Sequence, residues 1–297
     1  MGDFFEDSFA AAKFGFEWTK DSENWKSYGL CVLAYLLVFG LIIAAIIAPL
    51  LGMLASFKSP LDPNFSVGYL VYLLAAMLTI IVLFWIVQML IIGSVIANGL
   101  NKAGVAAKWP NLEKRKGAIL VAIISGFKAF FMWYDKKWLF VLLLTIILPL
   151  INPLLMIISV MLFFAYGGAS FFMNIRLSQS LFAYFASDTL TPSQAVDTSY
   201  ALTRGYAVSL FARLFVSSLS IGIVFWLLTF IPWAIFSILD MIIGIGIFSN
   251  LLAAVVNPLQ VFAALYSQAY IYSIVLQWNK ERLALMDKFQ PQKKANG

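Results

Sequence analysis

The chain contains no histidine and only one cysteine, Cys31, among its 297 residues. Histidine is the commonest general base and the commonest metal ligand, so its absence removes the usual groups for acid–base and metal chemistry. A single cysteine can form neither an intrachain disulfide nor a thiolate metal site on its own. The sequence also has no phosphate-binding glycine loop and no nucleophile-elbow serine. We therefore expect no catalytic residue, no metal site and no cofactor, although isolated carboxylates remain.

Charged residues are also scarce, at 11% of the chain against 62% hydrophobic. A soluble domain usually has about 25% charged residues. The apolar residues fall into long runs, and a helix needs about 20 of them to cross a bilayer. We predict an all-α polytopic membrane protein with six transmembrane helices in three hairpins. The predicted spans are residues 29–56, 67–98, 134–151, 153–175, 207–231 and 249–278.

The 20 basic residues indicate how these spans are oriented. All but Lys58 lie on one side of the predicted spans, either in the connecting segments or near the ends of the spans that border them. Cytoplasmic loops are enriched in Lys and Arg, so both termini are predicted to be cytoplasmic in a plasma or inner membrane. Residues 1–28 then form a cytoplasmic or interfacial segment, 29–278 the transmembrane domain and 279–297 a basic cytoplasmic tail. The net charge of +6 favours contact with anionic headgroups over contact with nucleic acid.

The main alternative topology has seven crossings, with residues 118–133 as the additional transmembrane helix. The segment is apolar but has only 16 residues and contains Lys128. A crossing here would reverse every later loop and distribute the basic residues over both sides. We predict an interfacial or partly buried helix instead.

A helix-forming segment precedes each predicted hairpin, and we call these three segments elbow helices. The first, 3–20, has an aromatic face and a charged face, as in a helix that lies in the headgroup plane. Docking of this helix on the protein's own bundle is an equal alternative. The second is 112–133. The third is 192–203, where Thr191 and Gln194 are spaced as a capping box.

The hairpins also share a proline near the predicted outer turn, at Pro49, Pro149 and Pro232. A threefold repeat is one interpretation. Coarse regularity common to any six-span protein is the alternative. The middle hairpin is short, because residues 138–172 supply 35 residues where two crossings and a turn need about 40. We predict that the outer face is recessed at this hairpin.

The segment 190–205 reads LTPSQAVDTSYALTRG. It resembles the signature of a group of poorly characterised prokaryotic six-span proteins, which includes the membrane domain of some glycerophosphodiester phosphodiesterases. The positions that match the signature are Arg176, Ala195, Ser199, Arg204 and Gly205. The likeness covers most of residues 118–275. The soluble phosphodiesterase domain has no counterpart here, so the resemblance implies a fold and a membrane location but no reaction.

Polar residues within the last two apolar runs are candidate intramembrane sites: Asp240, Asn250, Asn257 and Gln260. Ionisable groups in lipid are costly and often functional, so Asp240 is a candidate cation or proton site. The alternative is a bend at the outer interface, where the carboxylate meets water. The amides indicate either a solute pathway or ordinary hydrogen bonding between helices.

Small residues recur every four positions in the first run, at Gly40, Ala44, Ala48 and Gly52. This spacing lets two helices approach closely. We favour a neighbouring helix of the same chain over a second copy of the protein as the partner of this face.

These features favour a non-catalytic membrane organiser, meaning a lipid-contacting scaffold or an accessory subunit. A small-solute transporter or channel is the alternative, and we do not expect an enzyme. The expected partners are membrane lipids, with anionic headgroups at the cytoplasmic face, and either a protein partner or a second copy of the chain.

Overall fold

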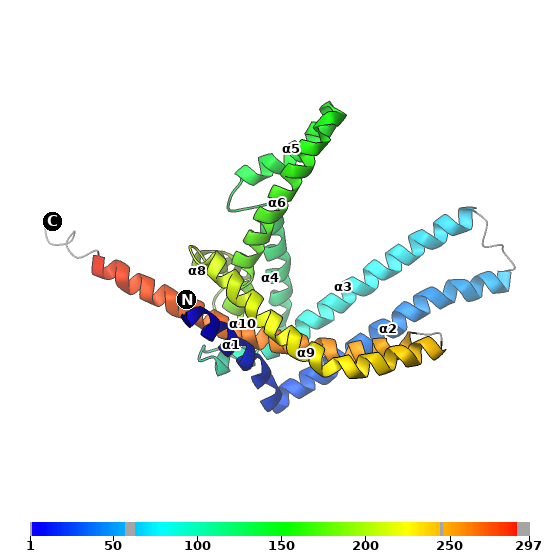
Figure 1. The fold of residues 1–297 in the computed structure, drawn as a ribbon, viewed down its shortest axis with the longest axis horizontal. Helices are drawn as coiled ribbons and strands as arrows, with labels where there is room; N and C mark the ends of the chain where they lie inside the picture. Colours follow the sequence, from blue (N-terminus) through cyan, green and yellow to red (C-terminus); the bar gives the residue numbers. More distant parts are fainter. Residues whose placement is uncertain (1, 57–62, 244–245, 290–297) are drawn as a thin grey trace.

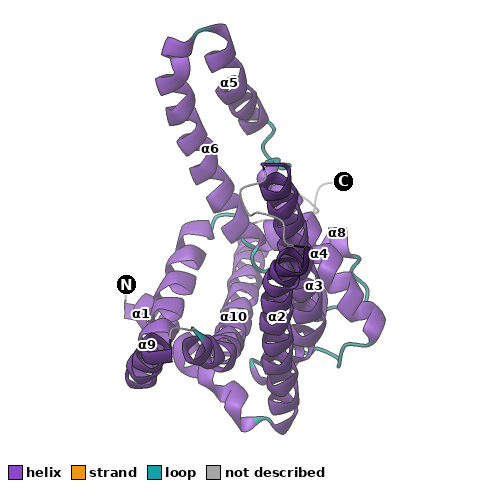
Figure 2. Ribbon diagram, turned by 90° about the vertical axis from the view of Figure 1, so that its right-hand side faces the viewer, coloured by secondary structure: helices purple, strands orange, loops and turns teal. Residues whose placement is uncertain are grey.

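The computed structural model describes residues 2–56, 63–243 and 246–289, and within these ranges the chain is all-helical without strands (Figures 1 and 2). The helices are α1 (Gly2–Gly15), η1 (Phe16–Lys20), α2 (Ser22–Ser56), α3 (Pro63–Lys102), α4 (Leu112–Phe130), α5 (Lys137–Ile151), η2 (Pro153–Leu155), α6 (Met156–Leu177), α7 (Ser180–Phe185), α8 (Pro192–Leu202), α9 (Ala207–Ile243) and α10 (Ile247–Phe289).

Five segments of the described chain are long and apolar enough to cross a membrane. They are Ser22–Ala45, Val71–Lys102, Pro153–Phe185, Ala207–Ile243 and Ile247–Lys280. The apolar helix α5 has only 15 residues and is shorter than these. The protein therefore has the character of a multi-pass membrane protein, whereas six crossings stay a prediction.

The long helices pack in consecutive pairs. Helix α2 lies along α3, α5 along α6, and α9 along α10. Figure 1 shows the three pairs diverging from a common base, with α5–α6 projecting away from α9–α10. Large apolar side chains are exposed along all three pairs. Contiguous apolar surface of this kind indicates contact with lipid or with another protein.

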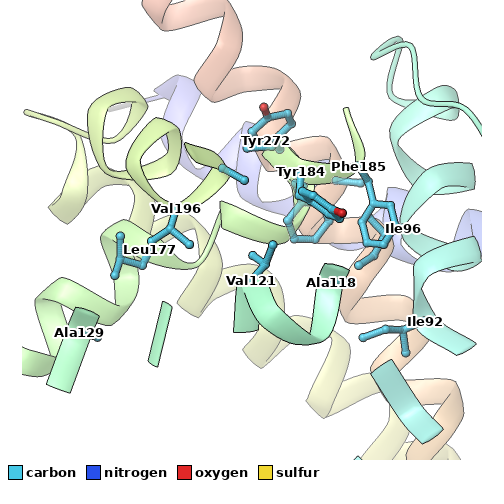
Figure 3. Packing of buried hydrophobic residues seen from close by; sticks show 14 of the residues in the cluster. Ile92, Ile96, Ala118, Val121, Ala129, Leu177, Tyr184, Phe185, Val196 and Tyr272 are labelled. Atoms are coloured by element: carbon cyan, nitrogen blue, oxygen red, sulfur yellow. The ribbon is translucent and has the colours of Figure 1, made fainter. Parts of the chain in front are cut away.

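The largest hydrophobic cluster lies at the base, where short helices meet the ends of the long ones (Figure 3). It joins residues of α3, α4, α6, α7, α8 and α10. Close approach is required in this core, because a Cβ on Gly117 would stand 1.9 Å from the Tyr184 hydroxyl oxygen. The close packing at Gly117 therefore belongs to the base of the molecule.

The ends of two helices differ from the boundaries of the predicted spans. The third span was expected to start at residue 134, but α5 begins at Lys137. Residues 131–136 form turns instead, with Met132 at φ 46° and the Trp133 N–H bonded to the Lys128 carbonyl at 2.9 Å. The fifth was expected to end at 231, but α9 continues through Pro232 to Ile243. A proline removes one backbone hydrogen bond, and the apolar residues after it keep the helix intact.

The other two marker prolines also lie inside helices, Pro49 in α2 and Pro149 in α5. None of the three prolines therefore forms a turn. Each lies in the first helix of its pair, so the threefold repeat stays a prediction.

Helices form at all three predicted elbow segments. Helix α1 packs on α9 and α10 with Ala11 and Ala12 buried, while Phe5 and Phe9 on another face are exposed. The capping box of α8 is present, with Thr191 and Gln194 hydrogen-bonded reciprocally. Their position at a membrane surface stays a prediction.

Candidate functional site

The candidate site is a polar cluster that joins α4, α6 and α8 at the base. We call it the α8 cluster, and it consists of Lys128, Tyr134, Arg176, Ser193, Asp197, Ser199, Tyr200 and Thr203. Two of these residues, Arg176 and Ser199, belong to the signature on which the resemblance rests.

Arg176 lies in the last turn of α6 and contacts α8 in two ways. Its guanidinium lies 3.5 Å from the centre of the Tyr200 ring, and its Nη2 donates to the Tyr200 carbonyl at 3.2 Å. Its own carbonyl accepts hydrogen bonds from Ser199 Oγ at 2.8 Å and Thr203 Oγ1 at 3.1 Å. Ala195 and Ser199 are fully buried, so small residues allow α8 to lie against this helix end. The structure thus brings two signature residues, Arg176 and Ser199, into contact.

Lys128 forms the second half of the cluster, and its side chain is only 11% exposed. Its ammonium donates to Asp197 Oδ1 at 2.6 Å and also contacts Ser193 and Tyr134. The Tyr134 hydroxyl donates to the same Asp197 oxygen. The Tyr134 ring stacks on Tyr200 with centroids 3.8 Å apart, which links this half to Arg176.

The surroundings of Asp197 and Tyr134 keep each side chain in one protonation state. Burial opposes ionisation of Asp197, but the hydrogen bonds from Lys128 and Tyr134 outweigh it and hold the pKa of this carboxyl below its usual value. Burial, together with the bond to Asp197, raises the pKa of the Tyr134 hydroxyl. Asp197 therefore stays a carboxylate and Tyr134 stays protonated near neutral pH. This arrangement connects α4, α6 and α8 through hydrogen bonds and an ion pair.

The remaining signature residues, Arg204 and Gly205, lie in the turn between α8 and α9. Gly205 has φ +85°, a backbone conformation that other residues adopt only with strain. Arg204 is exposed. The conformation of this turn therefore explains why a glycine occupies position 205 of the signature.

A second polar network, which the sequence did not reveal, ties the start of α2 to α3 and α10. Asn24 is fully buried and donates to the Tyr266 hydroxyl at 2.6 Å. Tyr266 in turn donates to Asp21 at 2.8 Å, and Lys102 pairs with Asp21 at 3.0 Å. Asn98 donates to Asn24 at 3.1 Å. Residues 242 positions apart meet here, so no local pattern could have predicted the contact.

Helix α1 is held by an ion pair as well. Arg213 of α9 donates to Asp7 at 2.8 Å, and its side chain is largely buried. The guanidinium also lies 4.6 Å from the centre of the Trp278 ring of α10. The N-terminal segment is therefore an integral part of the base.

Asp240 lies near the end of α9, and its carboxylate caps the start of α10. Its two carboxylate oxygens accept hydrogen bonds from the N–H groups of Phe248 and Ser249, each at 2.8 Å. A carboxylate at a helix start satisfies free N–H groups and complements the helix dipole. This geometry favours the interpretation of Asp240 as part of a bend over that of a cation site.

The three predicted amides have different surroundings. Asn250 donates to the Gly246 carbonyl, one turn earlier. Asn257 and Gln260 line a cavity of about 270 Å³ between α9 and α10, together with Thr229 and two tryptophans. Two of the four predicted polar residues thus share a cavity.

The small-residue face of α2 is exposed where its side chains are described. Gly40 and Ala44 are exposed, and no atom of the described chain lies within 4 Å of a Cβ built on Gly40. The expected neighbour from the same chain is therefore wrong at these two positions. The side chains of Ala48 and Gly52 lie outside the described residues.

The face of α4 that the rest of the protein leaves exposed carries a row of apolar side chains, which we call the α4 stripe. It comprises Leu120, Ile123, Phe127 and Phe130, at the spacing of one helix face. All four are exposed, Phe127 and Phe130 by 54% each, while Ala118 and Val121 on the other face are buried. The helix thus has two apolar faces, of which the protein covers one.

No family model, curated protein or solved structure matches the chain. The resemblance to the six-span group therefore rests on the signature residues alone.

Proposed function

We propose that the protein is a non-catalytic membrane organiser, a scaffold whose base contacts the cytoplasmic leaflet and whose apolar helix pairs enter the bilayer from that side. Both termini are cytoplasmic in this proposal. Six crossings and kinship with the six-span group belong to it as well. The observation that carries the proposal is the α4 stripe.

The α4 stripe and the residues around it are typical of a helix that lies in the plane of a membrane surface. Leaving a large apolar side chain in water instead of burying it costs about 1.5–3 kcal/mol, so four in one row favour an apolar environment. Trp109 and Trp133, both exposed, lie near the two ends of the helix. Tryptophan is enriched at membrane interfaces. Lys116 and Lys136, also exposed, would meet anionic headgroups beside the stripe.

Helix α1 supports the same placement. Phe5 and Phe9, one turn apart, are exposed, whereas its small residues dock on α9 and α10. Two of the three elbow helices therefore combine a face that packs on the protein with a face suited to lipid.

The depth of the α4 stripe in a bilayer tests this proposal. Cys31 is buried and can be replaced by alanine, so that a single spin label is attached at Phe127→Cys. In liposomes we expect this label to be accessible to oxygen and protected from a water-soluble nickel complex. The matched control is Ser193→Cys, on the exposed polar face of α8, which we expect to contact water. Equal exposure of both labels to the nickel complex would contradict the proposal.

A small-solute transporter or channel is the second candidate, favoured by the cavity that Asn257 and Gln260 line. This proposal predicts solute flux in liposomes that falls in Gln260→Leu. It also predicts a fall in Asp240→Asn if the carboxylate serves as a cation site. The organiser proposal predicts no flux and copurifying lipid. Absence of both flux and ligand-dependent stabilisation would remove the transporter.

A further inference from the structure

The tip of the α5–α6 pair is the most exposed apolar part of the described chain. Leu150 and Leu154 are 81% and 83% exposed, and Ile151 and Ile157 beside them are also largely exposed. Figure 1 shows this pair standing apart from the other helices, so no other element covers its end. An unpartnered tip of this composition needs an apolar environment.

Charge is absent along the whole pair. No Asp, Glu, Lys or Arg occurs in residues 138–175, a stretch that includes the turn. The turn of the α9–α10 pair, by contrast, is bounded by Asp240 and Asn250, and residues 57–62 of the first predicted hairpin contain Lys58 and Asp62. The middle pair differs from the others in having no charged residue in its turn or along its helices between residues 138 and 175.

Helix α5 is too short to expose this turn on the far side, although α6 with 22 residues is long enough to cross a bilayer. Helix α5 has 15 residues, which at 1.5 Å per residue extend about 22 Å. The hydrocarbon core of a bilayer is about 30 Å thick. A helix that starts at the cytoplasmic surface with Lys137 would therefore end inside the hydrocarbon.

The turn satisfies its own backbone donors, as a lipid environment requires. The Asn152 N–H donates to the Leu148 carbonyl at 3.1 Å, and the Leu155 N–H donates to the Asn152 carbonyl at 2.9 Å. The Leu154 N–H donates to the Asn152 side-chain oxygen at 2.9 Å. Pro153 has no N–H to satisfy. The turn thus needs no water for its backbone N–H groups.

Two hydroxyl residues in the half of the pair near the turn, Thr145 of α5 and Ser159 of α6, form hydrogen bonds within the pair. Thr145 donates to the Leu142 carbonyl, and Ser159 donates to the Thr145 carbonyl across the pair. Both side chains are buried between the helices. The outer surface of the pair is consequently free of these polar groups.

From these observations we infer that α5, η2 and α6 form a re-entrant hairpin, which enters and leaves the bilayer at the cytoplasmic face and ends among the lipid acyl chains. Lys136, Lys137 and Arg176 flank its two ends and stay at that face. The inference rests on the proposed membrane insertion and replaces two of the six crossings. Four crossings remain, so both termini stay on one side.

Cysteine labelling of the full-length protein in cells tests the hairpin, in a Cys31→Ala background. Asn152→Cys places a thiol at the tip. Asn250→Cys, at the start of α10, reports the outer surface, and Ser193→Cys on α8 reports the cytoplasmic surface. An impermeant maleimide is applied to intact cells, then to opened membranes, and finally after unfolding in detergent.

We expect Asn250→Cys to react in intact cells and Ser193→Cys only in opened membranes. Asn152→Cys should remain unreactive in both and react only after unfolding. Labelling of Asn152→Cys in intact cells would show a true crossing, and labelling only in opened membranes would show a pair outside the bilayer. Either result would overturn the hairpin.

Two further measurements distinguish failure of the hairpin from failure of the proposed membrane insertion. If Asn250→Cys is not labelled in intact cells, the proposed orientation fails and the hairpin with it. If Asn152→Cys does not accumulate, Leu154→Cys with a spin label replaces it. This label should then show high oxygen accessibility and low nickel accessibility, and the reverse would refute the hairpin.

Discussion

At the scale of single residues, the base uses its ionisable groups to hold helices together. Lys128 meets Asp197, Arg213 meets Asp7 and Lys102 meets Asp21. In the first two pairs the basic side chain is largely buried, so these pairs are shielded from solvent more than an ordinary surface pair. These pairs connect the elbow helices and the N-terminal segment to the rest of the base, which is a structural role.

Replacing Asp197 with asparagine should destabilise the protein. Lys128 would lose its charged partner while its side chain stays buried. We expect a loss of about 1–2 kcal/mol, at the low end for a charged hydrogen bond because Asp197 is itself half exposed. Unfolding in mixed SDS–detergent micelles measures the difference. Asp188→Asn is the matched control, because its pair with Lys108 is exposed on both sides and its loss should change little.

The same carboxyl predicts a dependence on pH. The pKa of Asp197 is lowered in the folded state, so its contribution is complete above its unfolded pKa of about 4. The contribution is lost as pH falls through the lowered folded value. The difference in unfolding midpoint between the wild type and Asp197→Asn should therefore be constant near neutral pH and shrink in acid. A difference that grows as the pH falls would contradict this assignment.

At the scale of helices, turn chemistry decides where the elements meet. The Thr191 capping box starts α8, and Gly205 at φ +85° redirects the chain into α9. The carboxylate of Asp240 starts α10 in a comparable way. Each device lies between helices whose packing defines the base or a helix pair.

Gly205→Ala should cost about 1–2 kcal/mol of unfolding free energy, because an L-residue is strained in the left-handed region. Gly126→Ala is the matched control. Gly126 lies inside α4 with no atom of the described chain within 4 Å of an added Cβ. There the same substitution should be neutral or stabilise by up to about 1 kcal/mol. Equal effects at the two glycines would refute the turn argument.

Local sequence signals predicted the helices better than their ends. The apolar runs predicted the long helices, and Thr191 with Gln194 predicted the start of α8. Pro232 was not a reliable signal for the end of α9. A proline interrupts one backbone hydrogen bond, and this apolar helix continues past it to Ile243. The bond between Asn24 and Tyr266 depends on tertiary packing, which no pattern in either segment encodes.

At the scale of the whole molecule, the base is an interlocked platform, α10 packs against α2 and α3, and the α5–α6 pair stands apart from the other helices. The network around Tyr266 joins both ends of the chain, since α2 and η1 meet α10 there. The α4 stripe and the exposed phenylalanines of α1 lie on elements of this platform. In our proposal the platform rests on the cytoplasmic leaflet and the pairs extend into the bilayer.

Tyr266→Phe should weaken the connection between the two ends of the chain. The substitution removes the hydroxyl that accepts from buried Asn24 and donates to Asp21, at a cost of about 1–3 kcal/mol. Tyr270→Phe is the control, because Tyr270 also contacts Phe14 but its hydroxyl forms no hydrogen bond with the described residues. Hydrogen exchange of α1 and η1 should rise in Tyr266→Phe and not in the control.

The side of the membrane on which the C-terminus lies tests the central claim most directly. The account requires an even number of crossings, with the basic segments cytoplasmic. Paired fusions of green fluorescent protein and alkaline phosphatase after Gly297 report this side in bacterial cells. We predict a fluorescent first fusion and an inactive second fusion. An active phosphatase with a dark fluorescent protein would place the C-terminus outside and contradict the account.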